Sequence, residues 1–456
     1  MKIKLKNIGT LKQAEIDLSK DLIVLAGPNN TGKTYAAYTV YGICEAIKNI
    51  SFVEPNDELA NAVILIVSQF FKNNESTEKI TVLNFFEQFE KAIKATFNKN
   101  GHKTLLNNVF ADHGNHFKES ELDLILDKNK IVQYLIDIKV EVSYVGSNIV
   151  KVNKAEKEDT FDLYIFNPED KKNIIPYLQW AYKMLASSAT EAYFKNIYIN
   201  TAERSAINIF SKELSIKRNN IVDQLLELRD TKGDANQLLG KLQRYPLPIR
   251  DSLVIAEDLA NLSRNKSEFS FLADRIEEVL LDGKINISKD GEVQYSPNKS
   301  KVKNLSIHLT ASIVKSLSNL VFYFRHLAQK GDFIIIDEPE LNLHPDNQRK
   351  IARLFGEIIN QGFKVMISTH SDYVIREINN LVMLKSGGGK ATDLIKKYGY
   401  EEKQLIDHQR VGAYLFKNNR NYDIEVTETG FEVDTIDEEI NNLNNASEDI
   451  YFTLFD

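Results

Sequence analysis

The chain has almost no cysteine, the residue that forms disulfides and many structural zinc sites. Its 456 residues include a single cysteine, Cys44, which excludes an intramolecular disulfide and a cysteine-based zinc site and suits a reducing cytosol. No stretch approaches the roughly 18 apolar residues that span a bilayer. The first residues, Met1–Lys6, alternate like a strand and lack the apolar core of a signal peptide. We therefore expect a cytoplasmic protein with no membrane partner, of one large or two to three medium domains.

Basic residues are missing from the C-terminal end of the chain. From Asn421 to Asp456 there are 11 acidic residues and no Lys or Arg. The net charge of the whole chain is −7, so the preceding part is mildly basic, which neither demands nor excludes nucleic-acid binding. The acidic stretch also has strand-like pieces at Ile424–Val426 and Gly430–Val433 and an aromatic end. We interpret it as the surface of a folded element, because a disordered tail would lack these features.

A glycine-rich octapeptide carries the strongest chemical signal. Gly27–Thr34 reads G-x-x-x-x-G-K-T, follows the apolar run Leu22–Ala26 and precedes the helix-compatible run Tyr35–Tyr41. This is the strand–loop–helix context of a phosphate-binding P-loop, in which backbone N–H groups converge on phosphate oxygens. A chance glycine-rich turn is the alternative. The predicted nucleotide-binding residues of this loop are Gly27, Asn29, Asn30, Thr31, Gly32, Lys33 and Thr34. Lys33 would reach the β- and γ-phosphates, and the Thr34 hydroxyl would ligate Mg²⁺.

Two carboxylates follow a second apolar strand. Phe333–Ile336 is continuously apolar, as in a parallel strand covered on both faces, and Asp337 and Glu338 come directly after it. Ligands of open α/β sheets bind beyond the carboxyl ends of the strands, so we expect both carboxylates beside the P-loop. Asp337 suits the Mg²⁺ shell, and Glu338 suits the general base that activates the attacking water. The alternative is a solvated acidic turn.

A third apolar strand ends in a histidine. Phe363–Ile367 leads into Ser368-Thr369-His370-Ser371, after an intervening helix expected over Asp346–Asn360. We predict that His370 lies beside the γ-phosphate and contributes to catalysis by sensing it. The alternative is a structural histidine, which is the usual role of a lone histidine at a strand end.

The motifs divide the chain into a core and its insertions. We assign to the core residues 1–45, 196–210 and 301–400. Residues 46–195 are interpreted as an insertion, helical and then strand-like, and residues 211–300 as a helical insertion that ends in a hairpin. Residues 401–456 are expected to form an acidic C-terminal extension. In the segment 196–210, Glu203 and Arg204 follow a strand, where they either touch nucleotide, couple two lobes, or form an ordinary salt-bridged turn.

Together the motifs resemble the ABC-type ATPases. Leu309–Leu317, followed by a helix expected over Asn319–Gln329, resembles the ABC signature region, and Asp337–Pro345 resembles a D-E-P-E-x-x-L-H-P block. That block is typical of RecF/SMC-related ATPases, especially the overcoming-lysogenization-defect (OLD)-like AAA ATPases, whose P-loop and histidine strand also match. The resemblance covers residues 1–45 and about 196–400. It implies an α/β fold: an ABC-type P-loop ATPase head with a mixed sheet, helical and α+β insertions and a small C-terminal extension.

The resemblance also implies a site shared between two subunits. The P-loop of one subunit would face the signature residues Thr310, Ser312 and Lys315 of another across ATP and Mg²⁺, in head-to-tail dimers. The usual signature glycine is missing, because Ile313 follows Ser312. A bulky residue there would weaken the contact with the γ-phosphate, so hydrolysis is expected to be slow. OLD proteins carry a C-terminal TOPRIM nuclease, and the residues after Tyr400 are too few for one, so we do not expect nuclease activity from this chain.

Three functions are compatible with such an ATPase. Many OLD-like ATPases serve bacterial defence against phages, in systems such as Septu and PARIS. The first hypothesis is therefore an ATPase that senses a phage protein or nucleic acid and controls a separate effector, a nuclease or other toxin encoded nearby. The second is a RecF/SMC-like repair or maintenance ATPase that acts directly on DNA, with salt-sensitive stimulation by DNA. The third, the nucleotide-binding subunit of a transporter, would need a surface for a membrane partner.

Overall fold

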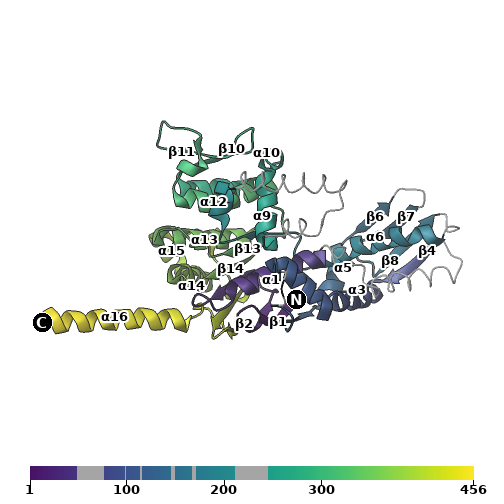
Figure 1. The fold of residues 1–456 in the computed structure, drawn as a ribbon, viewed down its shortest axis with the longest axis horizontal. Coiled ribbons are helices and arrows are strands. Elements are labelled where there is room, and N and C mark those ends of the chain that lie inside the picture. Colours follow the sequence, from purple (N-terminus) through teal and green to yellow (C-terminus); the bar gives the residue numbers. More distant parts are fainter. Residues whose placement is uncertain are drawn as a thin grey trace.

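A nine-stranded mixed sheet forms the body of the molecule (Figure 1). The computed structural model describes residues 1–48, 77–97, 99–112, 114, 116–144, 149–166, 171–210 and 245–455. The strand order of the sheet is β5-β1-β2-β16-β15-β3-β14-β13-β9. Its strands are Lys2–Ile8 (β1), Leu11–Asp17 (β2), Leu22–Ala26 (β3), Glu121–Ile125 (β5), Ile197–Asn200 (β9), Phe333–Asp337 (β13), Lys364–Thr369 (β14), Val411–Lys417 (β15) and Arg420–Ile424 (β16).

The centre of this sheet is parallel. Strands β15, β3, β14, β13 and β9 run in one direction, so their carboxyl ends lie at the same edge. The three strands that precede the predicted motifs, β3, β13 and β14, are buried along their whole length, as their apolar runs indicate. In the register of the sheet, Asp337 is opposite Ser368, and Ser368 is opposite Leu25. The ends of these strands therefore bring all three motifs together.

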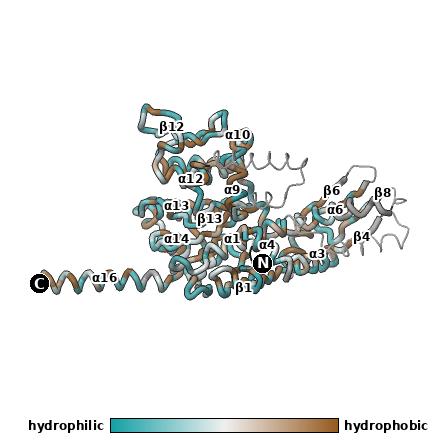
Figure 2. Tube along the Cα trace, viewed as in Figure 1, coloured by the Kyte–Doolittle hydropathy of each residue, from teal (hydrophilic) through white to brown (hydrophobic). Residues whose placement is uncertain are grey.

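Helices cover both faces of the sheet. Ile23 and Leu25 of β3 belong to the hydrophobic cluster under α1 (Lys33–Lys48), whereas Leu22 and Val24 belong to a second cluster on the other face. This second cluster packs against α12 (Ser312–Phe322), α13 (Pro345–Asn360) and α14 (Asp372–Ser386). Alternate residues of a strand point to opposite faces, so a fully apolar strand can serve both layers. In Figure 2 hydrophobic stretches of the chain run through the middle of the body.

An α/β arm extends from one side of the body (Figure 1). It contains an antiparallel sheet of order β4-β8-β7-β6 with helices packed on it. The elements of the arm are Thr77–Thr81 (β4), Val82–Thr96 (α3), Lys99–Phe110 (α4), Lys128–Asp137 (α5), Val140–Tyr144 (β6), Ile149–Lys154 (β7), Thr160–Phe166 (β8) and Lys171–Thr190 (α6). Although β5 lies in the same stretch of sequence, it pairs antiparallel with β1 at the edge of the main sheet. The arm is thus built into the core.

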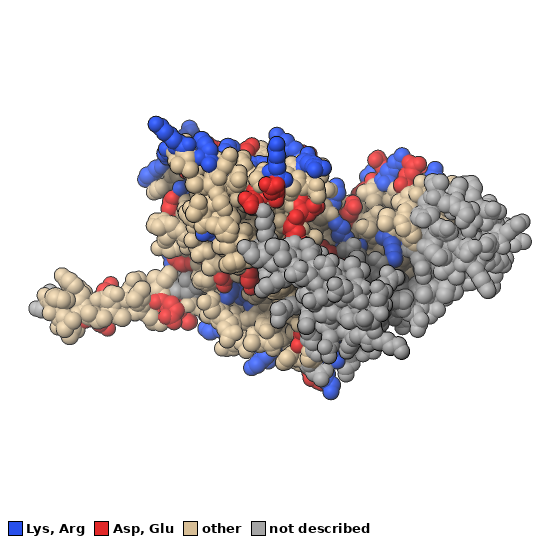
Figure 3. All heavy atoms as spheres, turned by 45° about the horizontal axis from the view of Figure 1, so that its top comes forward, with Lys and Arg blue, Asp and Glu red and all other residues tan. Residues whose placement is uncertain are grey.

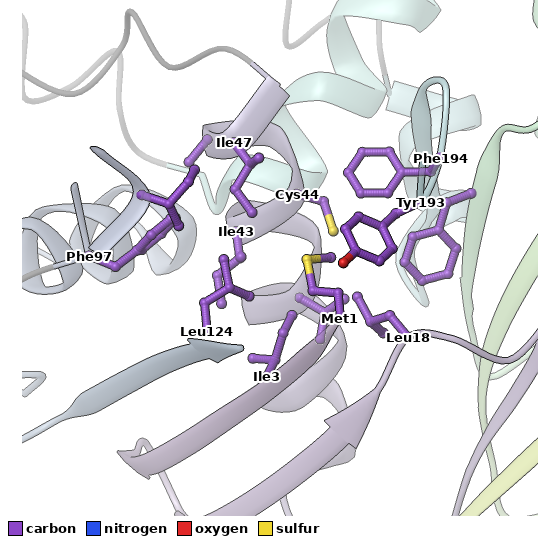
Figure 4. Close-up of a cluster of buried hydrophobic side chains, with 14 of the residues drawn as sticks. Met1, Ile3, Leu18, Ile43, Cys44, Ile47, Phe97, Leu124, Tyr193 and Phe194 are labelled. Atoms are coloured by element: carbon purple, nitrogen blue, oxygen red, sulfur yellow. The ribbon is translucent and has the colours of Figure 1, made fainter. Parts of the chain in front are cut away.

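Figure 4 shows how the arm and the body share one hydrophobic core. Phe97, which follows α3 of the arm, and Leu124, on β5 of the main sheet, lie near Ile43 of α1, and all three are buried. Tyr193 and Phe194, between α6 and β9, lie near Cys44 on the same cluster. Cys44 is fully buried, and burial raises the pKa of its thiol far above the ordinary value. A thiol in this environment is an inert packing group.

Besides the body and the arm, the molecule has a third lobe, which packs against α12 and α13. It carries a three-stranded antiparallel sheet, β10-β11-β12, whose first hairpin turns at Asp290-Gly291, in the stretch where the sequence predicts one. Residues 211–244 of the predicted helical insertion lie outside the described residues. The elements of the lobe are Leu247–Glu257 (α9), Leu259–Leu262 (α10), Ser270–Ile276 (α11), the π-helix Glu277–Leu281 (η1), Gly283–Ile287 (β10), Val293–Pro297 (β11), Leu305–Ser306 (β12) and the 3₁₀ turn Ile307–Leu309 (η2).

Short helices connect the remaining parts of the core. The helix expected over Asn319–Gln329 is instead the end of α12 followed by a π-helix, because α12 already begins at Ser312. The remaining short elements are the π-helix Tyr323–Leu327 (η3), the 3₁₀ turns Gly388–Ala391 (η4), Glu402–Gln404 (η5) and His408–Arg410 (η6), and the helix Thr392–Tyr398 (α15).

Two strands from the C-terminal part of the chain, β15 and β16, belong to the main sheet. Strand β15 pairs parallel with β3, and β16 turns back antiparallel to β15. The strand predicted over Gly430–Val433 is wrong, since Gly430 forms only a single bridge with Thr427. The acidic residues beyond it form a 22-residue helix, α16 (Asp434–Phe455), which projects from the body on the side opposite the arm (Figure 1).

Candidate nucleotide-binding and catalytic site

The predicted P-loop is a compact turn between β3 and α1. Gly27 has a φ of +133°, and a Cβ added there would lie 2.3 Å from the carbonyl oxygen of Phe416 on β15. Only glycine fits so close to a neighbouring backbone, which explains the first glycine of the motif. Gly32 has a φ of +101° and Asn30 a φ of +61°. Such left-handed turns direct successive backbone N–H groups into one concavity.

Lys33 lies within the loop that it completes. Its Nζ donates hydrogen bonds of 2.8 Å to the carbonyl oxygens of Gly27 and Pro28, and the side chain is buried. Burial lowers the pKa of Lys33, and the negative charges of Glu338 and Asp337 act in the opposite direction. Lys33 therefore supplies a positive charge close to both predicted carboxylates, in a turn whose amides attract anions.

The rim of the loop is polar. Asn29 and Asn30 are exposed, and Thr31 is half-buried. The Oγ1 of Thr31 donates a 2.8 Å hydrogen bond to the carbonyl oxygen of Pro28, which closes the turn. The amide side chains of the two asparagines are accessible to a ligand that approaches from solvent.

One buried carboxylate joins the three predicted motifs. Asp337 ends β13 and accepts hydrogen bonds from the hydroxyl groups of Thr34, at 3.1 Å, and of Ser368. Thr34 lies in the first turn of α1, and Ser368 lies on β14. Burial raises the pKa of Asp337 to about 6, although both hydroxyls act to lower it. The two residues predicted to ligate a metal, Thr34 and Asp337, are thus in direct contact.

This pair fits Mg²⁺ by the chemistry of its donors. Magnesium prefers oxygen ligands and is usually held by one or two protein groups together with water and phosphate. The described residues contain no cluster of three or more His, Cys, Asp or Glu that could hold a metal, so an all-protein metal cage is not present in that part of the chain. The buried Asp337 carboxylate accepts hydrogen bonds from two neutral hydroxyls, which leaves a charge that a cation would offset.

Glu338 follows in an unusual backbone conformation. Its φ is +49°, and such a conformation costs a non-glycine residue about 1–3 kcal/mol. The Glu338 N–H donates to the Oγ and the carbonyl oxygen of Ser368, each at 3.1 Å. Its carbonyl oxygen accepts from Arg204 at 2.7 Å. These contacts hold the backbone on both sides of Glu338. The negative charge of its half-buried carboxylate acts to raise the pKa of both Lys33 and Asp337.

Arg204 is a site residue that the sequence indicated only as one of several alternatives. Its fully buried guanidinium donates to the carbonyl oxygens of Thr201, Asp337 and Glu338, at 3.0, 2.8 and 2.7 Å. The neighbouring Glu203 accepts a 3.0 Å hydrogen bond from Tyr38 of α1. These contacts join the segment after β9 to α1 and to the end of β13. A guanidinium fork can hold two adjacent carbonyls, which a lysine cannot reproduce.

His370 is anchored by a buried glutamate. The His370 N–H donates to Glu340 Oε1 at 2.9 Å, and its ring Nδ1 lies 3.4 Å from the same oxygen. The hydroxyl of Thr369 also donates to Glu340 Oε1, at 2.8 Å. The His370 side chain is 42% exposed, whereas Glu340 is buried and its Oε2 has no hydrogen-bond partner among the described residues. Glu340 therefore fixes the end of β14, from which the imidazole reaches solvent.

The predicted signature residues lie around the start of α12, on the face of the sheet opposite α1. Ser312 is exposed, and Thr310 and Lys315 are half-buried. The Oγ1 of Thr310 donates to the carbonyl oxygen of Ile307 at 2.7 Å, and the Lys315 carbonyl accepts from Asn208 at 2.8 Å. Within one chain, the motifs of the P-loop, β13 and β14 are brought together, and these three residues belong to a separate surface.

Replacement of Asp337 by asparagine tests how much the burial of its negative charge destabilises the fold. A carboxyl whose folded pKa of about 6 exceeds the ordinary 3.8 stabilises the fold fully below pH 3.8, and this contribution is lost as the pH rises through 6. Without Mg²⁺ and nucleotide, Asp337→Asn should therefore raise the free energy of unfolding at pH 8 by about 2–3 kcal/mol, with no gain at pH 4. Denaturant unfolding at both pH values measures this difference.

The control for that experiment is the buried Asp332 just before the same strand. Its carboxylate accepts hydrogen bonds from Asn196, Tyr323 and Gln329. Asp332→Asn should destabilise the protein at both pH values, because it disrupts these bonds. A destabilised Asp337→Asn protein at pH 8 would contradict the assignment of a costly buried charge.

The fold and the convergence of these motifs define an α/β P-loop ATPase head with a mixed sheet and helical insertions. Residues 1–375 match the AAA_15 family, the AAA ATPase domain. The chain belongs to this family, which confirms the predicted fold class and places the protein among ATPases. Within the described residues no helix is both long and apolar enough to cross a membrane.

Curated relatives are similar over shorter stretches. The phosphonates import ATP-binding protein PhnC 2 of Pseudomonas syringae pv. syringae is 34% identical over 80 residues, which are 16% of this chain and 29% of that protein. The cell division ATP-binding protein FtsE of Streptococcus pneumoniae is 30% identical over 79 residues, 17% of this chain and 34% of that protein. A putative ABC transporter ATP-binding protein of Listeria monocytogenes is 27% identical over 103 residues, 20% and 38% respectively. The chain thus spans well under half the length of these relatives.

The solved structures that this chain matches include Smc head domains. The Smc head domain bound to the C-terminal domain of ScpA, from Pyrococcus furiosus, has a TM-score of 0.33 and 13% identity, and the match covers 98% of both chains. The SMC head domain from Thermotoga maritima has a TM-score of 0.30 and 12% identity, over 93% of this chain and 98% of that chain.

Proposed function

We propose that this chain binds ATP with Mg²⁺ at the P-loop and hydrolyses it slowly. The observation that carries the proposal is the contact between Thr34 of the loop and Asp337 of β13. Lys33 and the loop amides would bind the phosphates, and Thr34 and Asp337 would hold Mg²⁺, which when bound neutralises phosphate charge. Positioning and charge neutralisation are the main sources of catalysis in phosphoryl transfer.

Glu338 is the proposed general base. Its backbone is fixed by Ser368 and Arg204, so its carboxylate can accept a proton from a water in a constant position. His370, at the end of the adjacent strand, is proposed to contact the γ-phosphate and to report its presence. Glu340 anchors the backbone of His370 through its N–H, so in this proposal the imidazole side chain alone responds when the phosphate leaves.

The active form is proposed to be a head-to-tail dimer that shares two sites. The signature surface at the start of α12 includes the exposed Ser312 and, just before it, Leu309, which is 74% exposed. The support for this dimer is the resemblance of Leu309–Leu317 to the ABC signature region. In the proposed dimer, Thr310, Ser312 and Lys315 of one copy complete the phosphate site of the other.

The cellular role that we propose is control of a separate effector in antiphage defence. The support is the resemblance of Asp337–Pro345 to the D-E-P-E-x-x-L-H-P block of the OLD-like ATPases. In this role, ATP would hold the chain in a dimer that restrains the effector, and a phage protein or nucleic acid would release it.

Co-expression with the products of adjacent genes tests this role. We expect an affinity-tagged chain to co-purify with one of these products, and cells that carry both genes to resist phage infection. The Lys33→Ala variant should abolish the resistance while the protein remains folded. The absence of both a partner and a phage phenotype would reject the defence role and leave the ATPase proposal untouched.

A second candidate, direct action on DNA, is favoured by one observation. Lys299, Lys301 and Lys303 are exposed in the loop between β11 and β12, and Figure 3 shows lysines and arginines gathered over this end of the molecule. This candidate predicts that duplex DNA stimulates ATP hydrolysis, with a stimulation that falls steeply as salt is raised. Replacement of the three lysines by glutamate should remove it.

A further inference from the structure

Helix α16 has no packing partner along most of its length. It projects from the body (Figure 1), and every residue described from Asn441 to Phe455 is exposed. The exposed residues include Leu443 at 67%, Ile450 at 59% and Leu454 at 67%. An ion pair between Lys417 and Glu438, at 3.9 Å, ties the helix to the body near its start.

The composition of α16 does not support an isolated helix in water. Its middle contains four asparagines, Asn441, Asn442, Asn444 and Asn445, and asparagine is a weak helix former. Most helical stability in proteins comes from packing of an apolar face and only a small part from intrinsic propensity. A partner that covers the apolar side chains would therefore stabilise α16.

The spacing of the apolar residues suits another helix as the partner. Ile440, Leu443, Ser447, Ile450 and Leu454 are alternately three and four residues apart, and Ile436 continues the same spacing in the sequence. This repeat of 3.5 residues is the seam of a two-helix coiled coil. We call these five residues, from Ile440 to Leu454, the seam. The polar seam position is compatible with burial, because the Ser447 hydroxyl donates a 2.8 Å hydrogen bond to the carbonyl oxygen of Leu443.

If the partner is a second copy of α16, the charge distribution favours the antiparallel direction over the parallel one. In the sequence, four acidic residues fall in the first six positions of the helix, at 434, 437, 438 and 439, and the last six residues described include none. A parallel pair would place the two acidic ends together, which costs repulsion. An antiparallel pair places each acidic end beside the uncharged end of the other copy. Glu448 and Asp449 fall between Ser447 and Ile450, outside the seam.

We propose that α16 pairs with α16 of a second copy in an antiparallel coiled coil. In this register Ile440 packs against Ile450 of the second copy, and Leu443 packs against Ser447 of the second copy. The contact is independent of the nucleotide site and of the proposed function. Because the helix supplies only about three heptads, the isolated contact is weak, and it acts by raising the effective concentration of chains for other contacts.

Light scattering of the full chain without nucleotide tests the contact. The Lys33→Ala background removes any dimer that ATP would hold. We expect a concentration-dependent dimer, and Ile450→Glu should raise its dissociation constant at least about tenfold, because a charge would enter the apolar seam. Phe452→Glu is the matched control. Phe452 is 57% exposed, two residues from Ile450 on the same helix but outside the seam, so its replacement should leave the dimer intact.

Two results would overturn the contact itself. One is a chain that stays monomeric at high concentration, in which case α16 binds a different protein. The other is an equal effect of Ile450→Glu and Phe452→Glu, which would mean that the seam has no special role.

Cysteine cross-linking tests the direction of the helices. The single native cysteine, Cys44, is buried, so it does not compete for the oxidant. In an antiparallel pair, a mixture of Leu443→Cys and Ser447→Cys chains should form a disulfide-linked dimer on mild oxidation, and neither variant alone should do so. A covalent dimer of Ser447→Cys alone would instead indicate parallel helices and would reject the proposed register.

Discussion

Replacement of Glu338 by glutamine is expected to leave ATP binding intact and to slow hydrolysis by about 10²- to 10⁴-fold, the usual contribution of a general base. The substitution keeps the size of the side chain and removes its negative charge, and with it the ability to accept a proton from water. The backbone at Glu338 is held by Ser368 and Arg204, so the replacement should not disturb the loop. Single-turnover hydrolysis and a separate measurement of nucleotide affinity distinguish the two effects.

The same variant should accumulate as an ATP-bound dimer, because hydrolysis is the step that releases the proposed dimer. Sizing with and without ATP measures this. Glu268→Gln, the same change at an exposed site in the third lobe, is the control and should behave like the wild type. If the Glu338→Gln protein hydrolyses ATP at the wild-type rate, the general base lies elsewhere.

Loss of Lys33 should have an equally large effect, but on binding. Its ammonium group is buried beside the loop carbonyls, close to Asp337 and Glu338. Without Lys33, the negative phosphates would lie near the carboxylates of Asp337 and Glu338 with no positive side chain from the first turn of α1 to offset the repulsion. A hydrogen bond between charged groups contributes about 1.5–3 kcal/mol, so Lys33→Ala should weaken ATP binding at least about tenfold and abolish measurable turnover. Lys48→Ala, at the other end of α1, is the control for loss of a lysine from this helix.

A mixture of two inactive variants tests whether the site is shared between copies. Ser312→Glu would place a negative charge against the phosphates of the partner site, yet it is tolerated locally because Ser312 is exposed in the first turn of α12, where an acidic residue is favourable. In a head-to-tail dimer of one Lys33→Ala chain and one Ser312→Glu chain, one site carries both changes and the other carries neither. The mixture should therefore recover activity that neither variant has alone. No recovery at any ratio would reject the shared site.

The local sequence was sufficient to predict that the P-loop, the two carboxylates and the histidine lie together, because each motif follows a strand of the same parallel sheet. The apolar runs before Gly27, Asp337 and Ser368 are buried strands, and their carboxyl ends meet at one edge. The contact between Thr34 and Asp337 is therefore a consequence of strand order, which the motifs anticipate. The catalytic and ligand roles of these residues, and of His370, stay predictions until they are measured.

Other contacts depend on residues that are distant in sequence and have no local signature. The apolar run Val411–Phe416 is a central strand beside β3, and its Phe416 carbonyl is what restricts position 27 to glycine. The sequence offered the apolar run as a signal, but nothing in it specifies the neighbour. Arg204 was visible only as a charged residue after a strand, and its role in holding the carbonyls of Asp337 and Glu338 required the third dimension.

For the C-terminal helix, the sequence predicted the charge but not the arrangement. Its acidic character could be read from the sequence. The strand predicted at Gly430–Val433 was wrong because Phe431 and Val433 are buried in the hydrophobic core as part of a loop, so their alternation reflects packing and not strand pairing. That α16 leaves the body with its seam uncovered could be known only from the arrangement of the rest of the chain.

The sequence by itself determined the P-loop, the two carboxylates, the histidine strand and the α/β class, because each depends on residue type at short spacing along the chain. The tertiary structure decided which strand restricts the P-loop, which arginine holds the backbone of Glu338, and on which face of the sheet Ser312 lies. These features arise from pairing and packing between distant segments, and the free energy of such contacts depends on how the whole sheet is ordered.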